Sequence, residues 1–248
     1  MNPERERILR EMGLGPVWKL RVPQAAVPCE QEAAAPALAV PAVASDPSAA
    51  GDSPLAAPVA APAWDELAGA VATCRRCRLC EARKQAVLGV GDRNADWLFV
   101  GEGPGAEEDA RGEPFVGQAG KLLDAMLAAI DLRRGNRVYI GNAVKCRPPN
   151  NRMPEAEETA ACFPYLQRQI ELIRPKLIVA LGKPAAETLL NMEVKVGAAR
   201  GRLFDYRGIP LVVTYHPAYL LRNLTDKAKA WEDLCFARRT MRGLAEAG

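Results

Sequence analysis

The sequence lacks any apolar run of the roughly 18 residues that a membrane-spanning helix needs, so it predicts no membrane span. The charged N-terminus, MNPERERILREMG, also lacks the apolar core of a secretory signal. We therefore expect a cytoplasmic protein, whose thiols stay free or bind metal instead of forming disulfides. The net charge is only +3, so overall charge does not by itself indicate a nucleic-acid partner, and any basic surface must be local.

The composition changes along the chain and predicts three segments. Residues 1–22 are expected to form a short, partly helical N-terminal peptide. Residues 23–63 are mostly alanine, proline and valine, with too much proline for a helix and too few large apolar side chains for a core. We interpret them as a disordered linker. Residues 64–245 have the mixed composition of a folded domain, and 248 residues are enough for one α/β domain with such an appendage.

Strands and helices are predicted to alternate within residues 64–245. Four short runs rich in branched and aromatic residues indicate buried strands at 97–101, 138–141, 177–181 and 211–214. Helical periodicity covers 119–130, 154–173, 184–190 and 225–244, and a hairpin is expected at 202–208. This alternation predicts a three-layer α/β/α fold around a central four-stranded parallel sheet. Ligands of such sheets bind beyond the carboxyl ends of the strands.

Seven cysteines are present, and four of them have the spacing of metal ligands. Cys74 and Cys77 form a Cys-x-x-Cys pair after a predicted helix, and Cys146 and Cys162 follow the second strand. The pair needs two more thiolates for four-fold ligation, which the other two cysteines can supply. The spacing does not distinguish zinc from an iron–sulfur cluster, and a set of unrelated buried thiols is the alternative. Cys80 is a fifth candidate.

The first predicted strand is followed by the residues GEGPG at 101–105, whose glycines allow the backbone to approach a ligand closely. A dinucleotide-binding loop needs a glycine motif that opens directly into a helix. Pro104 interrupts the motif, and we expect the next helix only near Ala119, so a nicotinamide or flavin site is disfavoured. Glu102 is a candidate catalytic carboxylate, or else a loop carboxylate that caps backbone N–H groups.

Three further side chains lie at predicted strand ends or in the loops between strands. Phe115 is a candidate stacking platform for a base, although a lone phenylalanine is more often a core residue. Asn142 ends the second strand, where its amide can read a base edge or simply form a turn. His216, the only histidine in the chain, follows the fourth strand and is either a site residue or a structural one.

Two features are consistent with nucleic-acid binding. Leu220, Leu221 and Arg222 combine apolar groups with a cation, as in wedges that enter DNA, or they form an ordinary packed helix. A basic group around the second strand fits phosphate binding and a solvated face equally well. Its members are Arg133, Arg134, Arg137, Lys145, Arg147 and Arg152.

Taken together, the motifs over about residues 66–240 resemble the family 4 uracil-DNA glycosylases, the iron–sulfur branch of that superfamily. The matching segments are Cys74-x2-Cys77, GEGPG at 101–105, EPFVG at 113–117, NAVKCRPP at 142–149, Cys162 and HPAYLLR at 216–222. The resemblance implies a uracil-DNA glycosylase-like fold and a monofunctional enzyme that hydrolyses the N-glycosidic bond of uracil in DNA. It also implies a structural 4Fe–4S cluster on Cys74, Cys77, Cys146 and Cys162, with Cys80 left outside.

The resemblance further implies a role for each strand-end residue. The expected catalytic residues are Glu102, Asn142 and His216. The expected uracil-binding residues are Gly101, Glu102, Gly103, Phe115, Asn142 and His216. The expected DNA wedge consists of Leu220, Leu221 and Arg222.

The expected partner is uracil-containing DNA, single- or double-stranded, bound by a monomer. Residues 1–22 are expected to contact a replication or repair protein. Two other function classes remain open. A non-catalytic iron–sulfur module associated with a replication or repair enzyme would bind nucleic acid without releasing a base. A dinucleotide-dependent oxidoreductase is disfavoured by Pro104 and by Asn142, which stands where an acidic residue would end the second strand.

Overall fold

The computed structural model describes residues 63–246, which lie within one compact unit of the chain. The N-terminal peptide predicted at 1–22, and all but the last residue of the linker predicted at 23–63, lie outside the described residues. Within the described range, no helix is both long enough and apolar enough to span a membrane.

A mixed sheet forms the centre of the fold, with the strand order β1-β3-β2-β4-β6-β5. Its strands are β1 (Val90–Gly91), β2 (Trp97–Gly101), β3 (Val138–Asn142), β4 (Leu177–Leu181), β5 (Leu203–Tyr206) and β6 (Ile209–Thr214). The four central strands are parallel, as predicted, whereas β1 and β5 are antiparallel to their neighbours. The expected total of four strands is wrong because these two edge strands extend the sheet. Only two residues long, β1 is too short to produce a periodic pattern.

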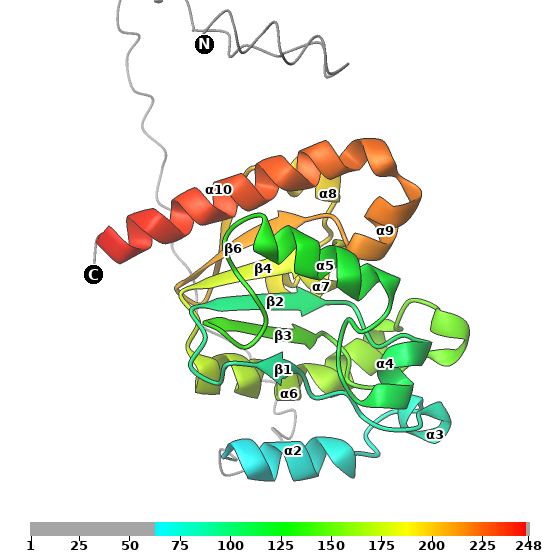
Figure 1. The fold of residues 1–248 in the computed structure, drawn as a ribbon. Coiled ribbons are helices and arrows are strands. Elements are labelled where there is room, and N and C mark those ends of the chain that lie inside the picture. Colours follow the sequence, from blue (N-terminus) through cyan, green and yellow to red (C-terminus); the bar gives the residue numbers. More distant parts are fainter. Residues whose placement is uncertain (1–62, 247–248) are drawn as a thin grey trace, which may run out of the picture. The chain divides into compact units, whose positions relative to one another are not determined.

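Helices cover both faces of the sheet and complete the three layers α/β/α (Figure 1). One face packs against α5 (Gln118–Ala128), α9 (Pro217–Arg222) and α10 (Lys227–Glu246). The other packs against α6 (Ala156–Ile173), α7 (Lys183–Leu190) and α8 (Val196–Ala199). Side chains of β2 alternate between the two cores, with Trp97 and Phe99 in one and Leu98 and Val100 in the other. Burial on both faces explains why this strand is a continuous apolar run.

Segments outside the central strands test two local predictions. The hairpin is confirmed, because β5 and β6 pair around Arg207 and Gly208, whose φ angles of 52° and 86° suit a tight hairpin turn. The expectation that the next helix after residues 101–105 begins only near Ala119 is wrong, because α4 (Ala106–Arg111) begins directly after Gly105. This helix removes one of the two arguments against a dinucleotide-binding loop. The other argument, that Pro104 interrupts the glycine motif, still holds. The other helices described are α2 (Trp64–Ala72), α3 (Leu79–Ala82) and the 3-10 turns η1 (Pro149–Asn151) and η2 (Leu224–Asp226).

The order of the parallel strands indicates where a ligand should bind. From β2 the chain crosses to β3 on one side, then returns past β2 to β4 and β6 on the other. The direction of winding therefore reverses between β2 and β4. In such sheets the ligand lies outside the carboxyl ends of the strands at this reversal. The loops after β2, β3, β4 and β6 should accordingly form the site.

Candidate functional site

A pocket of about 730 Å³ opens at this carboxyl edge, formed by the loops that follow the parallel strands. Its lining includes the predicted site residues Glu102, Gly103, Phe115, Asn142, His216 and Arg222. Gly101 lies behind the lining, where it is the register partner of Asn142 in the adjacent strand. The structure therefore brings together side chains that lie up to 120 residues apart in the sequence, from 102 to 222.

The side chain of Asn142 is the clearest indication of what the pocket binds. Asn142 ends β3 and is 1% exposed, and neither its Nδ2 nor its Oδ1 has a hydrogen-bond partner among the described residues. A buried polar group left unpaired costs about 1–3 kcal/mol. Because folded proteins rarely leave such groups unsatisfied, we expect the amide to pair with a ligand that offers both a donor and an acceptor.

Gly101 is required for the close approach of two site side chains. A Cβ atom at this position would lie 2.5 Å from Asn142 Oδ1 and 2.5 Å from Phe115 Cζ. Both distances are far below van der Waals contact. Any larger residue at 101 must therefore displace the amide, the aromatic ring, or both.

Phe115 is held in a backbone conformation that its side chain disfavours. Its φ is 56°, in the left-handed region, which costs a bulky residue about 1–3 kcal/mol. The ring is buried, and its centroid lies 5.5 Å from that of the His216 ring. Gly120 allows this placement, because a Cβ there would lie 1.7 Å from the carbonyl oxygen of Phe115. Strain of this kind persists only where surrounding contacts maintain it.

His216 follows β6, caps α9 and is held in its neutral form. Its Nδ1 accepts a hydrogen bond from the backbone N–H of Ala218 at 3.1 Å, so the ring proton is assigned to Nε2. Burial, reinforced by the positive charge of Arg222, lowers the pKa of His216 to about 4. Gly182 gives the ring room, because a Cβ there would lie 3.0 Å from the Cβ of His216. At neutral pH this imidazole is therefore a hydrogen-bond donor through Nε2 and carries no charge.

Glu102 enters the same pocket from the loop after β2. Burial raises the pKa of its carboxyl above the ordinary glutamate value. Its backbone carbonyl accepts a hydrogen bond from the N–H of Val144 at 3.1 Å, which continues the pairing of β2 with β3 beyond the strands. At Gly103, a Cβ would lie 2.7 Å from Val144 Cγ2. The backbone of this loop is thus packed closely on the segment after β3, and this packing sets the position of Glu102.

The three residues of the predicted wedge do not share one environment. Leu220 is 1% exposed and packs in the core, so the expected role of a DNA wedge does not fit it. Leu221 is 41% exposed, and Arg222 at the end of α9 lines the pocket. Consecutive residues of a helix point in directions about 100° apart, because one turn takes 3.6 residues. Three in a row therefore cannot all face a ligand.

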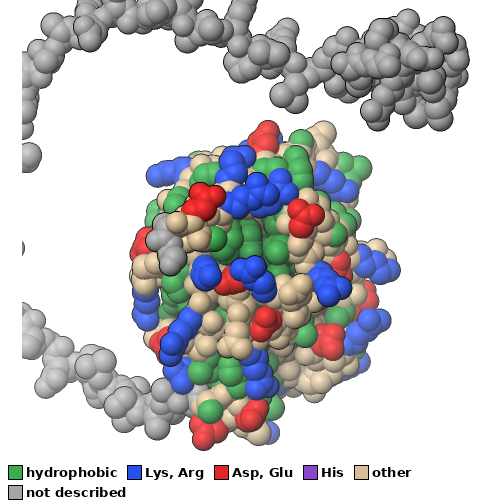
Figure 2. All heavy atoms as spheres, turned by 60° about the vertical axis from the view of Figure 1, so that its left-hand side comes forward, with side chains coloured by type: hydrophobic (Ala, Val, Ile, Leu, Met, Phe, Trp, Pro, Cys, Tyr) green, Lys and Arg blue, Asp and Glu red, His purple; other side chains and the backbone are tan. Residues whose placement is uncertain are grey.

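The basic residues around the second predicted strand do not form one patch. Lys145 is 1% exposed, and its Nζ donates to the carbonyl of Asn142 at 2.8 Å and to Gln169. Arg137 pairs with Asp96 at the amino ends of β2 and β3, away from the pocket. Figure 2, in which these amino ends turn toward the viewer, shows basic and acidic side chains interspersed on that face. A single phosphate-binding surface made by this group is not supported.

The four predicted metal ligands face one narrow pocket although they come from distant segments. Cys74, Cys77, Cys146 and Cys162 all line it, and Cys80 does so too. Within residues 63–246, no group of three or more histidine, cysteine, aspartate or glutamate side chains is arranged to hold a single metal ion. The structure thus brings the expected ligand set together around one pocket.

Hydrogen-bond donors are directed at the sulfurs of this cysteine pocket. Arg83 donates from its guanidinium to Cys146 Sγ at 2.8 Å and to the carbonyl of Cys74 at 3.0 Å. The backbone N–H of Lys145 donates to Cys162 Sγ at 3.2 Å. Burial raises the pKa of Cys162 to about 11, so this thiol stays protonated at neutral pH until a metal displaces the proton. N–H donors aimed at sulfur are typical of iron–sulfur sites, where they stabilise the thiolate charge.

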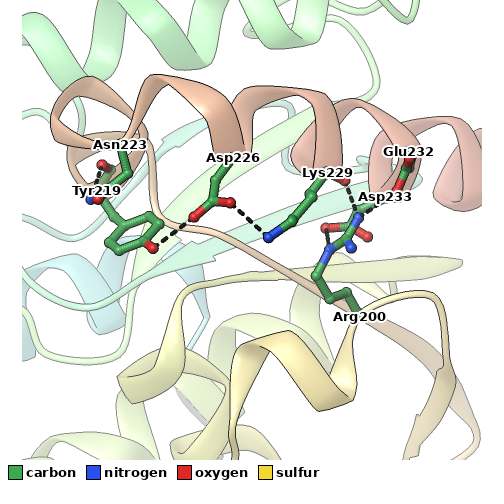
Figure 3. Close-up of polar contacts among 7 residues, drawn as sticks. All are labelled: Arg200, Tyr219, Asn223, Asp226, Lys229, Glu232 and Asp233. Carbon is green, nitrogen blue, oxygen red and sulfur yellow. Dashed lines mark hydrogen bonds and ion pairs between the residues drawn. The ribbon is translucent and has the colours of Figure 1, made fainter.

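A polar network of Arg200, Asp233 and Thr214 behind the His216 loop was not indicated by the sequence, and Figure 3 draws its Arg200–Asp233 pair. Arg200 donates from Nε to Asp233 Oδ2 at 3.1 Å. The same oxygen accepts from the hydroxyl of Thr214, the last residue of β6, at 2.8 Å, and Asp233 is 1% exposed. The network ties α10 to the strand that delivers His216. Its members are separated by 14 to 33 positions, so no local motif signals it.

Comparison with known proteins agrees with this geometry. The sequence model of the uracil DNA glycosylase superfamily matches residues 88–235. The Type-4 uracil-DNA glycosylase of Archaeoglobus fulgidus is 44% identical over 165 residues, which cover 63% of this chain and 82% of that protein. Its counterpart in Thermotoga maritima is 47% identical over 161 residues, covering 64% and 83%. That of Saccharolobus solfataricus is 46% identical over 167 residues, covering 64% and 77%. Because the matched residues include the whole sheet and the pocket at its carboxyl edge, the chain belongs to the uracil DNA glycosylase superfamily.

Proposed function

We propose that this protein excises uracil from DNA by hydrolysing the N-glycosidic bond, releasing free uracil and leaving an abasic site. The observation that supports this most directly is the buried, unpaired amide of Asn142 in a pocket of a uracil DNA glycosylase superfamily member. A base-sized ligand with one donor and one acceptor on its edge satisfies that amide.

Recognition requires the uracil to leave the base stack, which costs a few kcal/mol. Phe115 then stacks on the flipped base. Asn142 accepts from uracil N3–H and donates to O4. Cytosine presents the opposite pattern and would leave each amide atom unpaired, at about 1–3 kcal/mol per group. This difference is the proposed basis of selectivity.

Bond cleavage leaves negative charge on the departing uracil. The Nε2–H of His216 donates to O2 as this charge develops, and one well-placed donor is worth about 3 kcal/mol. Because the ring is neutral, it stabilises the charge by hydrogen bonding without transferring a proton. Glu102, as the carboxylate, orients the attacking water or stabilises the developing positive charge on the sugar. Gly101 and Gly103 allow the close backbone approach that these contacts need.

Contact with DNA beside the flipped base is assigned to Leu221 and Arg222. Leu221 is the exposed apolar side chain of α9, and Arg222 lies at the pocket mouth. Leu220 supports this helix from the core. In this arrangement the apolar group fills space left by the base, and the guanidinium stays near the phosphates.

Cys74, Cys77, Cys146 and Cys162 are proposed to hold a 4Fe–4S cluster. When bound, the cluster would supply a cross-link between the segment after α2 and the loop after β3. Arg83 supports the same junction through Cys146 and the carbonyl of Cys74. Brown absorbance and about four irons per chain in purified protein are the expected signs of this cluster. A colourless protein that contains zinc would contradict the assignment.

Uracil release from a uracil-containing oligonucleotide, single- or double-stranded and without added metal, tests the proposed activity. Asn142→Ala should lower the single-turnover rate about 100-fold, because two hydrogen bonds to the base are lost. It should leave the cluster absorbance unchanged. Absence of release by wild-type protein from both substrates would overturn the proposal. DNA retention without release would instead support the non-catalytic module.

Three further expectations stay predictions. They are a monomeric state, a cytoplasmic location, and contact of residues 1–22 with a replication or repair protein. Size-exclusion chromatography with light scattering tests the first.

A further inference from the structure

Phe115 sits in a loop whose backbone is held from both sides by charged side chains outside the predicted site. The strained φ of 56° means that the loop needs external contacts to keep this shape. Two side chains supply them, Glu108 on α4 and Arg134 in the connection between α5 and β3.

Arg134 holds the carbonyl side of the loop. Its guanidinium donates to the carbonyl oxygen of Pro114 at 2.8 Å and to that of Phe115 at 2.5 Å. It is itself fixed by an ion pair with Asp124 on α5. The planar guanidinium can serve both carbonyls and the carboxylate at once, which a lysine cannot do.

Glu108 holds the amide side of the same loop. One of its carboxylate oxygens accepts from the N–H of Val116 at 2.9 Å and from that of Gly117 at 3.2 Å. The other accepts from the N–H of Gly105 at 3.1 Å. One carboxylate therefore joins the end of the 101–105 loop, which contains Glu102, to the loop that contains Phe115.

We propose that Glu108 and Arg134 are positioning residues that together hold Phe115 in the conformation that stacks on the flipped base. This inference rests on the proposed function, since it deepens the account of the same pocket. Arg134 acts through Phe115, whereas Glu108 acts through Phe115 and, by its bond to the Gly105 N–H, through the loop that contains Glu102. Arg134 binds the carbonyl groups of Pro114 and Phe115. Glu108 binds the N–H groups of Val116 and Gly117, the next two residues.

The test is a double-mutant cycle. Arg134→Gln and Glu108→Gln are each made in wild-type protein and in Phe115→Ala, and single-turnover uracil release is measured. In wild type each change should lower the rate about 10- to 100-fold, because a stacking group displaced by about 1 Å loses this much. In the Phe115→Ala background the further loss from Arg134→Gln should be under about 3-fold, since the group being positioned is gone. The further loss from Glu108→Gln should be smaller than in wild type, and its remainder comes from the loop that contains Glu102. Equal losses in both backgrounds would overturn the proposal, as would no loss in wild type.

Matched controls separate this effect from a general loss of charge. Glu157→Gln alters an exposed glutamate of α6, and Arg239→Gln alters an exposed arginine of α10. Neither should change the rate. Arg134→Lys should give an intermediate loss, because an ammonium can reach only part of the contact set. It replaces Arg134→Gln in the cycle if the glutamine variant does not fold.

Hydrogen exchange provides a readout that does not depend on catalysis. Without DNA, Glu108→Gln should speed exchange of the Val116 and Gly117 amides, and Glu157→Gln should not. If wild-type protein releases no uracil but exchange responds in this way, the proposed function fails while the positioning of Phe115 stands. If exchange does not respond, Glu108 does not position this loop, whatever the activity.

Discussion

At the scale of single residues, Gly101 is the position where the pocket tolerates least change. Gly101→Ala should lower uracil release about 10- to 100-fold, because its Cβ would displace Asn142 or Phe115, each 2.5 Å away. Overpacking should also lower the free energy of unfolding by about 1–3 kcal/mol. Single-turnover kinetics and urea unfolding measure the two effects.

Gly69→Ala is the matched control for this substitution. Gly69 lies in α2, and a Cβ there would meet no atom within 4 Å. Activity should not change, and stability should rise by up to about 1 kcal/mol because alanine favours a helix. Equal activity of the two variants would show that the crowding at 101 has no bearing on the site.

The pH dependence of uracil release should be set by Glu102 on its acid side. Burial raises the pKa of this carboxyl, so the carboxylate, and activity with it, should be lost as pH falls through a value above that of ordinary glutamate. His216 does not set this limb, because its pKa of about 4 keeps the ring neutral above that pH. A pH profile of the single-turnover rate measures the limb. Glu102→Gln should be slow and lack it, and an unchanged limb in that variant would contradict the assignment.

At the scale of single residues, the sequence indicated which side chains stand at strand ends but not their surroundings. Asn142 and His216 could be placed because the first ends a buried strand and the second comes two residues after one. The unpaired state of the Asn142 amide and the neutral state of His216 depend on burial by other segments. Sequence patterns did not single out Glu108 and placed Arg134 only in the basic group, because the loop groups that these residues bind lie 8 to 20 positions away.

At the scale of elements, the polar network behind β6 joins three segments that the chain visits separately. Arg200 precedes β5, Thr214 ends β6, and Asp233 lies on α10. Removing one partner of a buried charge pair leaves the other unpaired. The network therefore supports the position of α10 against the loop that carries His216.

Arg200→Met should lower the free energy of unfolding by about 2 kcal/mol, because it leaves Asp233 buried without its counter-charge. This expected loss of stability is smaller than the loss for a fully buried ion pair, because the Arg200 side chain is 16% exposed. Urea unfolding measures the change. Arg239→Met, at an exposed position of α10, should change stability by less than about 0.5 kcal/mol. Equal stabilities would show that the network contributes nothing.

The elements that sequence patterns identified best were those buried on both faces. The strands expected at 97–101 and 177–181 have those bounds in the structure, because each is a continuous apolar run ended by a turn residue. The elements missed include β1 and α4, which are two and six residues long, and α3 and α8, which have four residues each. Both β1 and α4 depend on neighbours for their stability, since β1 pairs with β3, and α4 is tied to the loop after Phe115 by Glu108.

At the scale of the whole molecule, the described residues 63–246 contain the complete sheet, both apolar cores, the pocket and the cysteine pocket. A variant lacking residues 1–62 should therefore fold and release uracil at a rate within about 3-fold of the full chain. Single-turnover kinetics of the two proteins provide the measurement. A loss of more than 10-fold would place residues 1–62 in the catalytic machinery.

By itself, the sequence determined the layer arrangement, the parallel central strands and the residues at their carboxyl ends, because these follow from local periodicity and chain order. The tertiary structure decided what those residues can do. It buried the Asn142 amide without a partner, strained Phe115, placed Leu220 in the core and set the cysteines around one pocket. Each of these depends on contacts between segments distant in the chain, which local patterns do not encode.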